Sequence, residues 1–189
     1  MALPPQLQPL VGTWRGTGSG HYPTIEPFSY TEELVFRDVA KPFLVYQQRT
    51  WSPEGQPMHM ETGFLRSPTP TTVEFVLAQP TGQAELAEGT LTPLEEGLLL
   101  ELQSPQVLVA TSAKPVQATV RTYRLTKNQL AADFSMAAVG VTMTHHLHSD
   151  LGRAEDCSRL RATTLRAAME LKDYDLATTT SARADYPRL

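Results

Sequence analysis

The sequence predicts an all-β protein whose main part is an antiparallel up-and-down β-barrel of about ten strands. Fifteen prolines and eleven glycines, most of them in the first 150 residues, leave segments of roughly 7–10 residues between turn signals. Most of these segments are rich in Val, Thr, Tyr and Phe, which favour strands. Their connections, such as 52–55 (SPEG), are short and polar, which favours pairing between strands that are neighbours in sequence.

A short helical turn is expected first, over residues 4–10 (PPQLQPL), where Leu7 and Leu10 can cover one end of the barrel. Ten candidate strands follow it: 28–38, 43–51, 58–66, 71–79, 83–92, 96–103, 106–112, 116–126, 129–137 and 141–151. This number of short strands is sufficient to close a barrel.

The composition changes near Ala154 to Arg, Ala, Thr and Leu without glycine. Helical spacing relates four residues of this segment, namely Leu160, Thr164, Ala168 and Leu171. We therefore expect an additional C-terminal helix, followed by a polar tail over 177–189 that frays. The expected organisation is a barrel domain over 1–153 and a C-terminal extension over 154–189.

Length and charge exclude several classes of protein. A chain of 189 residues with 41% hydrophobic positions suits one main domain. The net charge of −4 argues against wholesale binding to nucleic acids or anionic membranes. No apolar run approaches the roughly 18 residues that span a bilayer, and the first residues lack the pattern of a signal peptide. We therefore expect a cytoplasmic protein.

Residues 12–25 (GTWRGTGSGHYPTI) form a glycine-rich motif. Glycines at nearly alternate positions invite comparison with phosphate-binding loops, but Pro23 follows at once and no helix pattern opens after the glycines. We interpret the glycines as places where a strand bends sharply and another group approaches its backbone. The Gly-x-Trp element also resembles the lipocalin and fatty-acid-binding superfamily, in which the Trp seals the barrel end.

Taken with three further segments, this motif resembles the nitrobindin family of haem-binding β-barrels. The segments are 57–64 (PMHMETGF), 78–82 (AQPTG), and 135–138 (SMAA) leading to 144–147 (THHL). The similarity extends over residues 7–153. It implies a barrel that holds ferric haem and isomerises peroxynitrite to nitrate, with nitric oxide as a further ligand.

The resemblance also implies the site residues. The family's iron ligand is a His in an x-His-Leu pattern about ten residues after a Ser-Met-Ala, which makes His146 the metal-binding and catalytic residue here. Further cofactor contacts carry over to Met58, His59, Gln79 and Met136, and Thr17 of the glycine-rich motif is added to them. Because Cys157 is the only cysteine, the implied haem is b-type, held without covalent links at one per chain.

Strict alternation along the predicted strand 141–151 conflicts with this assignment. His146 and His148 share one face, whereas Met143 and Leu147 share the other. Hydrophobicity alone turns the Met143/Leu147 face inward and His146 toward water. If His146 instead faces a cavity, the Met143/Leu147 face points outward and must be covered. The C-terminal helix or the second subunit of a homodimer could cover it.

Pocket composition limits the chemistry. Soft, apolar side chains such as Met58 and Met136 suit a flat macrocycle, although methionine is also common as core filler. The sequence shows no Arg and His pair of the kind that peroxidases use, so the pocket is expected to be poor in distal acid–base groups and weak as a peroxidase.

Three alternatives stay open. Arg121 and Tyr123 share a strand face and could hold the carboxylate of a fatty acid in an intracellular lipid carrier, or they could be a surface ion-pair partner beside a packed aromatic. His146 and His148, with Asp150 beyond them, could chelate a metal ion without porphyrin. The C-terminal helix could act as an adaptor through Arg153, Arg159, Arg161 and Arg166, although acidic neighbours dilute this patch.

Overall fold

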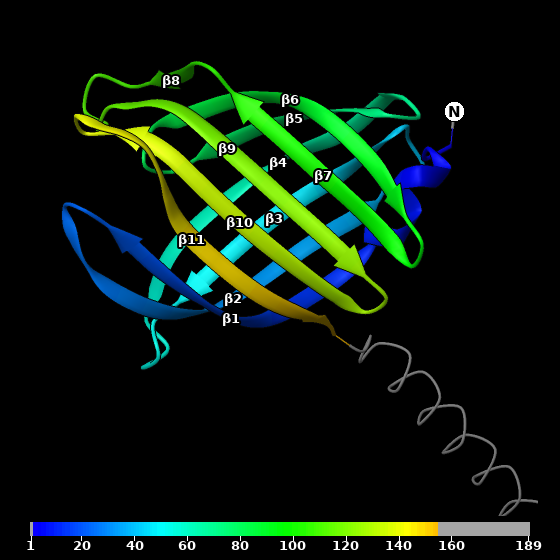
Figure 1. Ribbon diagram of the computed structural model, residues 1–189, viewed down its shortest axis with the longest axis horizontal. Helices are drawn as coiled ribbons and strands as arrows, with labels where there is room; N and C mark the ends of the chain where they lie inside the picture. The colour runs from blue at the N-terminus through cyan, green and yellow to red at the C-terminus, as the bar shows by residue number, and fades with distance from the viewer. Residues whose placement is uncertain (1, 155–189) are drawn as a thin grey trace, which may run out of the picture. The chain divides into compact units, whose positions relative to one another are not determined.

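Eleven strands and one 3₁₀-helix make up the part of the chain that the computed structural model describes, residues 2–154 (Figure 1). The helix is η1 (Pro5–Leu10), and the first six strands are β1 (Gly12–Tyr22), β2 (Ile25–Asp38), β3 (Phe43–Trp51), β4 (Pro57–Thr69), β5 (Thr72–Gln79) and β6 (Gln83–Leu94). The remaining strands are β7 (Gly97–Ser104), β8 (Val107–Val109), β9 (Val116–Thr126), β10 (Gln129–Ala138) and β11 (Val141–Arg153). The expected C-terminal helix lies outside the described residues. Within them, no helix is long and apolar enough to cross a membrane.

Ten of the strands close an antiparallel ring, as Figure 1 shows. The ring runs β5-β4-β3-β2-β1-β11-β10-β9-β7-β6, and β6 pairs with β5 to close it. The short β8 pairs with residues 83–85 of β6, whereas β7 pairs with residues 88–94, so β8 lies next to a different stretch of the same strand. The predicted all-β, up-and-down barrel is therefore confirmed.

Two strands differ from the expectation. The glycine-rich motif is itself strand β1, which pairs with β2 on one side and β11 on the other. The segment expected as a strand at 106–112 shrinks to the three residues of β8. A Cβ on Gly16 would overlap the carbonyl oxygen of Asp150, and a Cβ on Gly18 would overlap the ring of Tyr30. The glycines thus permit close approach to the backbone, as expected, along a strand that was not among the ten expected ones.

One end of the barrel is plugged by η1. Leu7, Leu10 and Trp14 are completely buried there, and the Trp14 indole N–H donates a hydrogen bond to the carbonyl oxygen of Leu10 at 2.9 Å. The Arg153 guanidinium stacks 4.1 Å from the centre of the Trp14 ring and donates to the carbonyl oxygen of Pro9 at 2.7 Å. The predicted covering of this end by Leu7 and Leu10 is confirmed. The other arginines of the adaptor alternative lie outside the described residues.

The β1–β11 contact provides a test of the close packing. Gly16→Ala places a methyl group against the Asp150 carbonyl, so β11 must shift, and we expect a loss of about 1–3 kcal/mol in the free energy of unfolding. Thr17→Ala is the matched control, because Thr17 is exposed on the outer face and its change should stay within about 0.5 kcal/mol. Denaturant titration measures both, and equal midpoints for Gly16→Ala and wild type would contradict the packing described.

Candidate functional site

The other end of the barrel contains a cavity of about 810 Å³. The β1–β2 turn, the β5–β6 turn and the segment 112–116 surround it, at the end of the barrel away from η1 (Figure 1). Its volume lies within the roughly 300–1,000 Å³ of small-molecule and cofactor sites. The fold therefore separates a plugged end from a hollow one.

A β-bulge decides where the predicted ligand His146 points. The consecutive residues Phe134 and Ser135 of β10 pair with Leu147 and His145 of β11, so His146 has no partner on β10. Such an extra residue bends a strand and can re-aim a side chain. Both His146 and Leu147 consequently line the cavity. The conflict raised by strict alternation is resolved for Leu147 by this break in the register, whereas Met143, before the bulge, is 43% exposed.

The His146 imidazole is held by a main-chain carbonyl. Its Nδ1 lies 3.0 Å from the carbonyl oxygen of His21, and because a carbonyl can only accept, Nδ1 carries the proton and donates. Burial lowers the pKa of His146 below its ordinary 6.5, which keeps the ring neutral at pH 7. Within the described residues, Nε2 makes no hydrogen bond, so its lone pair is free.

Aromatic side chains surround this ring. Tyr22 lies edge-on to it with the ring centres 5.2 Å apart, and Phe28 and Phe134 follow at 6.1 and 6.3 Å. A neutral imidazole whose N–H is fixed by a second group is the usual arrangement of a histidine that ligates a metal. The residues present therefore fit a haem iron at His146 Nε2.

Four of the five other predicted cofactor contacts line the same cavity: Met58, His59, Gln79 and Met136. Thr17 does not line it. On β1 the even-numbered residues face the interior, so Thr17 lies on the outer face and is exposed.

A buried charge cluster at the inner part of the cavity escaped the sequence analysis. Both terminal nitrogens of Arg121 donate to Glu61, at 2.9 and 3.0 Å, and one also donates to Glu85 at 2.9 Å. Burial alone would raise the pKa of Glu61, but the charge of Arg121 together with the interactions of Glu61 with His59 and Arg121 outweighs it and holds this pKa at about 2. The cavity therefore contains more ionisable side chains than the sequence indicated, and the expected lack of distal acid–base groups stays a prediction. The sequence did contain a signal for the cluster, because the alternation of inward and outward side chains along the strands places Glu61, Glu85 and Arg121 on inward positions.

The same cluster bears on the lipid-carrier alternative. Arg121 and Tyr123 share the inner face, as expected, and both are buried, so the alternative of a surface ion pair was wrong. The Arg121 guanidinium already neutralises part of two carboxylates of the protein. A fatty-acid carboxylate would meet Glu61 and Glu85 as well as Arg121, which disfavours its binding there.

The non-haem metal alternative was wrong. His148 lies on the outer face beyond the bulge, where its Nδ1 contacts Asp133 at 2.8 Å and its Nε2 contacts Asp150 at 3.4 Å. It therefore does not converge with His146. Among residues 2–154, no group of three or more His, Cys, Asp or Glu side chains is placed to hold a metal ion.

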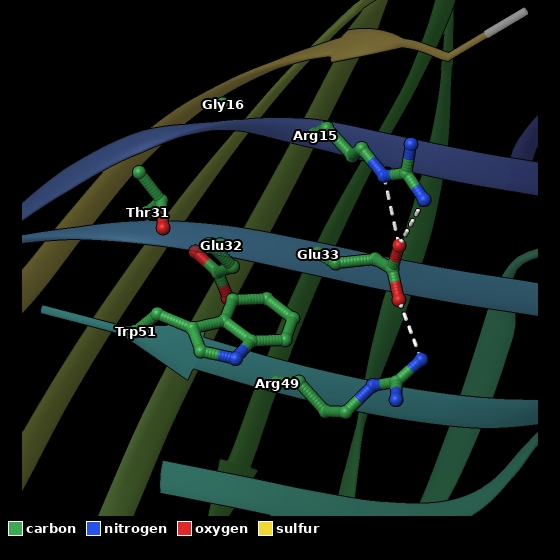
Figure 2. Close-up of a pocket in the computed structure, with 7 residues that line it drawn as sticks. All are labelled: Arg15, Gly16, Thr31, Glu32, Glu33, Arg49 and Trp51. Carbon is green, nitrogen blue, oxygen red and sulfur yellow. Dashed lines mark hydrogen bonds and ion pairs between the residues drawn. The ribbon is translucent and has the colours of Figure 1, made fainter. Parts of the chain in front are cut away.

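A second hollow, of about 500 Å³, lies over strands β1, β2 and β3 (Figure 2). There the Glu33 carboxylate accepts from Arg15 and from Arg49, each at 2.8 Å, and Figure 2 shows it between the two guanidinium groups. Trp51 borders the same hollow, with the Arg49 guanidinium 5.9 Å from its ring centre. These ion pairs join three adjacent strands, so we assign them to bracing of the barrel wall.

Comparison with known proteins gives concordant results. The family model described as "THAP4-like, heme-binding beta-barrel domain" matches residues 5–153. A "Peroxynitrite isomerase" of Nocardia farcinica (strain IFM 10152) is 47% identical over 148 residues, covering 78% of this chain and 88% of that protein. "Peroxynitrite isomerase 2" of Mycobacterium marinum (strain ATCC BAA-535 / M) is 46% identical over 148 residues, with coverages of 78% and 92%.

A solved structure extends the similarity to three dimensions. The crystal structure of Rv2717c from M. tuberculosis superimposes with a TM-score of 0.78 at 43% sequence identity. The match covers 81% of this chain and 99% of that chain. The two proteins are therefore similar in both sequence and backbone structure over the barrel.

The buried cluster leads to a stability prediction. Arg121→Met leaves Glu61 and Glu85 buried without their cation, and we expect a loss of about 3–5 kcal/mol in the free energy of unfolding at pH 7. Because the pKa of Glu61 is lowered from 4.5 to about 2, the stabilisation is present above about pH 4.5 and disappears as the pH falls toward 2.

The difference between wild type and Arg121→Met should therefore narrow across that pH range in denaturant titrations. The control is Arg124→Met, which removes an exposed arginine from the same strand and should change stability little. Equal losses for the two variants at pH 7 would contradict the role assigned to the cluster.

Proposed function

The chain belongs to the THAP4-like, heme-binding β-barrel family, and we propose that it is a ferric-haem protein that isomerises peroxynitrite to nitrate and binds nitric oxide. The observation that carries the proposal is the His146 imidazole, turned into the cavity with Nδ1 fixed by the His21 carbonyl and Nε2 free. Two relatives that are 46–47% identical carry the name peroxynitrite isomerase, which supports the activity.

His146 is proposed as the iron ligand and as the residue on which catalysis depends. When bound, ferric haem with one histidine ligand supplies an open iron site that accepts small nitrogen and oxygen species. The chain's own residues hold the imidazole neutral, fix its rotation and exclude bulk water with the rings of Tyr22, Phe28 and Phe134. We further propose one non-covalent b-type haem per chain.

The remaining pocket residues have distinct proposed tasks. Met58 and Met136 supply soft apolar walls for the macrocycle. Gln79 donates to Glu85 at 2.9 Å, which satisfies its amide and fixes it as part of the wall. The His59 Nε2 lies 4.0 Å from the Glu61 carboxylate, so its ring borders both the cavity and the charge cluster. A cytoplasmic location, and the absence of nucleic-acid or membrane partners, stay predictions from the sequence.

A homodimer is also proposed, and an apolar row on the outer face supports it. Val45, Phe64, Val76 and Leu86 are directly paired across β3, β4, β5 and β6. Phe64, Val76 and Leu86 are 50%, 45% and 53% exposed. An exposed apolar patch of this kind marks an interaction surface, and a two-fold axis would pack the row against its copy.

Sedimentation velocity tests the homodimer. We expect a dimer for the wild type and a monomer for Phe64→Glu, because the new charge would be buried in the interface without a partner. Thr17→Glu, on the exposed outer face of β1, should leave the dimer intact. A wild type that sediments as a monomer at every concentration would remove this part of the proposal.

Hemin titration tests the ligand. His146→Ala should abolish the Soret band that the wild type develops on hemin addition, because the iron loses its only protein ligand. His21→Ala is the control, since it removes an exposed imidazole but keeps the carbonyl that orients His146. Full hemin affinity in His146→Ala would eliminate the assignment.

Stopped-flow spectroscopy tests the activity. Haem-loaded wild type should speed the decay of peroxynitrite and direct it to nitrate, whereas apo-protein and His146→Ala should not. Protein that stays colourless after hemin addition, yet shifts a fluorescent fatty acid, would support the lipid carrier instead.

A further inference from the structure

The outer face of the barrel carries a side-chain cluster directly behind the His146 bulge. His145 Nε2 and His148 Nδ1 lie 3.1 and 2.8 Å from the same oxygen, Oδ1 of Asp133. Asp133 belongs to β10, and its direct partner on β11 is His148. One carboxylate oxygen therefore accepts hydrogen bonds from two histidines that flank His146.

The spacing of these histidines follows from the bulge. In a regular strand, residues three apart lie on opposite faces. Because His146 is the extra residue in the register, His145 and His148 instead lie on the same outer face while His146 faces the cavity. Asp133 thus connects the two ends of the bulge while His146 is turned inward.

Few other hydrogen bonds fix the bulge. The pairing of β11 with β1 ends at Leu147, so β1 provides no ladder hydrogen bonds beside His146. On β10 the neighbouring pairs are Phe134 with Leu147 and Ser135 with His145, and His146 itself has none. Inside the cavity, the ring has one hydrogen bond, to the His21 carbonyl. The Asp133 carboxylate supplies the restraint on the opposite side of the wall.

We propose that Asp133 is a positioning residue for the haem ligand, because its carboxylate clamps His145 and His148 across the bulge and so fixes His146 in its inward orientation. The proposal rests on the proposed function of His146 as the iron ligand. Asp133 also borders the cavity, but its carboxylate is engaged by His145 and His148, so in this role it acts through the backbone of residues 145–148. Its side chain is 42% exposed, so its contribution to the core is small.

Three variants test the clamp. Asp133→Ala removes both hydrogen bonds, and Asp133→Asn keeps one acceptor oxygen at the same place. Asp150→Ala is the matched control, because Asp150 is an exposed carboxylate on β11 that contacts only the far side of His148, at 3.4 Å. Apo-protein unfolding should be almost unchanged in all three, since exposed substitutions alter stability little.

The first readout is the apo-protein, independent of haem. With ¹⁵N-labelled histidine, the wild-type His146 ring should give one set of NMR signals with Nδ1 protonated and Nε2 bare. Asp133→Ala should give several sets of His146 signals or a changed tautomer. Asp133→Asn should recover most of the wild-type spectrum, and Asp150→Ala should keep the wild-type spectrum. A wild-type His146 spectrum in Asp133→Ala would overturn the proposal.

The second readout is haem loss to an excess of a haem-accepting protein. We expect Asp133→Ala to lose haem about 10–100-fold faster than wild type, as for other groups that orient a metal ligand. The iron–histidine stretching band of the reduced protein should broaden or shift in the same variant. The clamp would be refuted if Asp133→Ala lost haem at the wild-type rate and its iron–histidine band were unchanged. If His146→Ala were at the same time unable to hold haem, the proposed function would still stand. Failure of wild type to bind hemin would refute the proposed function, and the apo-protein spectra would still decide the clamp.

Discussion

One unpaired residue in β11 determines which side of the barrel wall His146 occupies. With a regular ladder between β10 and β11, Leu147 would line the cavity and His146 would face water. The break between Phe134 and Ser135 turns both side chains inward. Every functional statement about the cavity depends on this bulge, because it places an imidazole with a free Nε2 among the aromatic rings at the hollow end of the barrel.

The rest of the fold supports that end by closing the other one. Trp14, Leu7 and Leu10 fill the end under η1, and Arg153 fastens the last described strand to it. Between the plug and the His146 end, the Arg121 cluster places polar groups within the interior. It contains two carboxylates and one guanidinium, so the inner part of the cavity carries more negative than positive charge.

The barrel and its plug could be predicted because turn residues and strand-forming residues alternate along the chain, and because Leu7 and Leu10 precede the first strand. Strand β1 was missed because glycine is rare in strands, and without that strand the outward orientation of Thr17 could not be assigned. His146 and the family were predicted from motif resemblance and not from alternation, which pointed the wrong way. The bulge leaves no mark in residues 144–148 (THHLH). The meeting of Arg121, Glu61 and Glu85 needs the closed register of three distant strands.

A crystal structure of the protein loaded with ferric haem tests the central claim most directly. We predict that the iron is bonded to His146 Nε2, with Nδ1 still donating to the His21 carbonyl and the register between β10 and β11 still broken at His146. Iron bonded to another side chain such as His59, or a porphyrin bound outside the cavity, would contradict this description of the site.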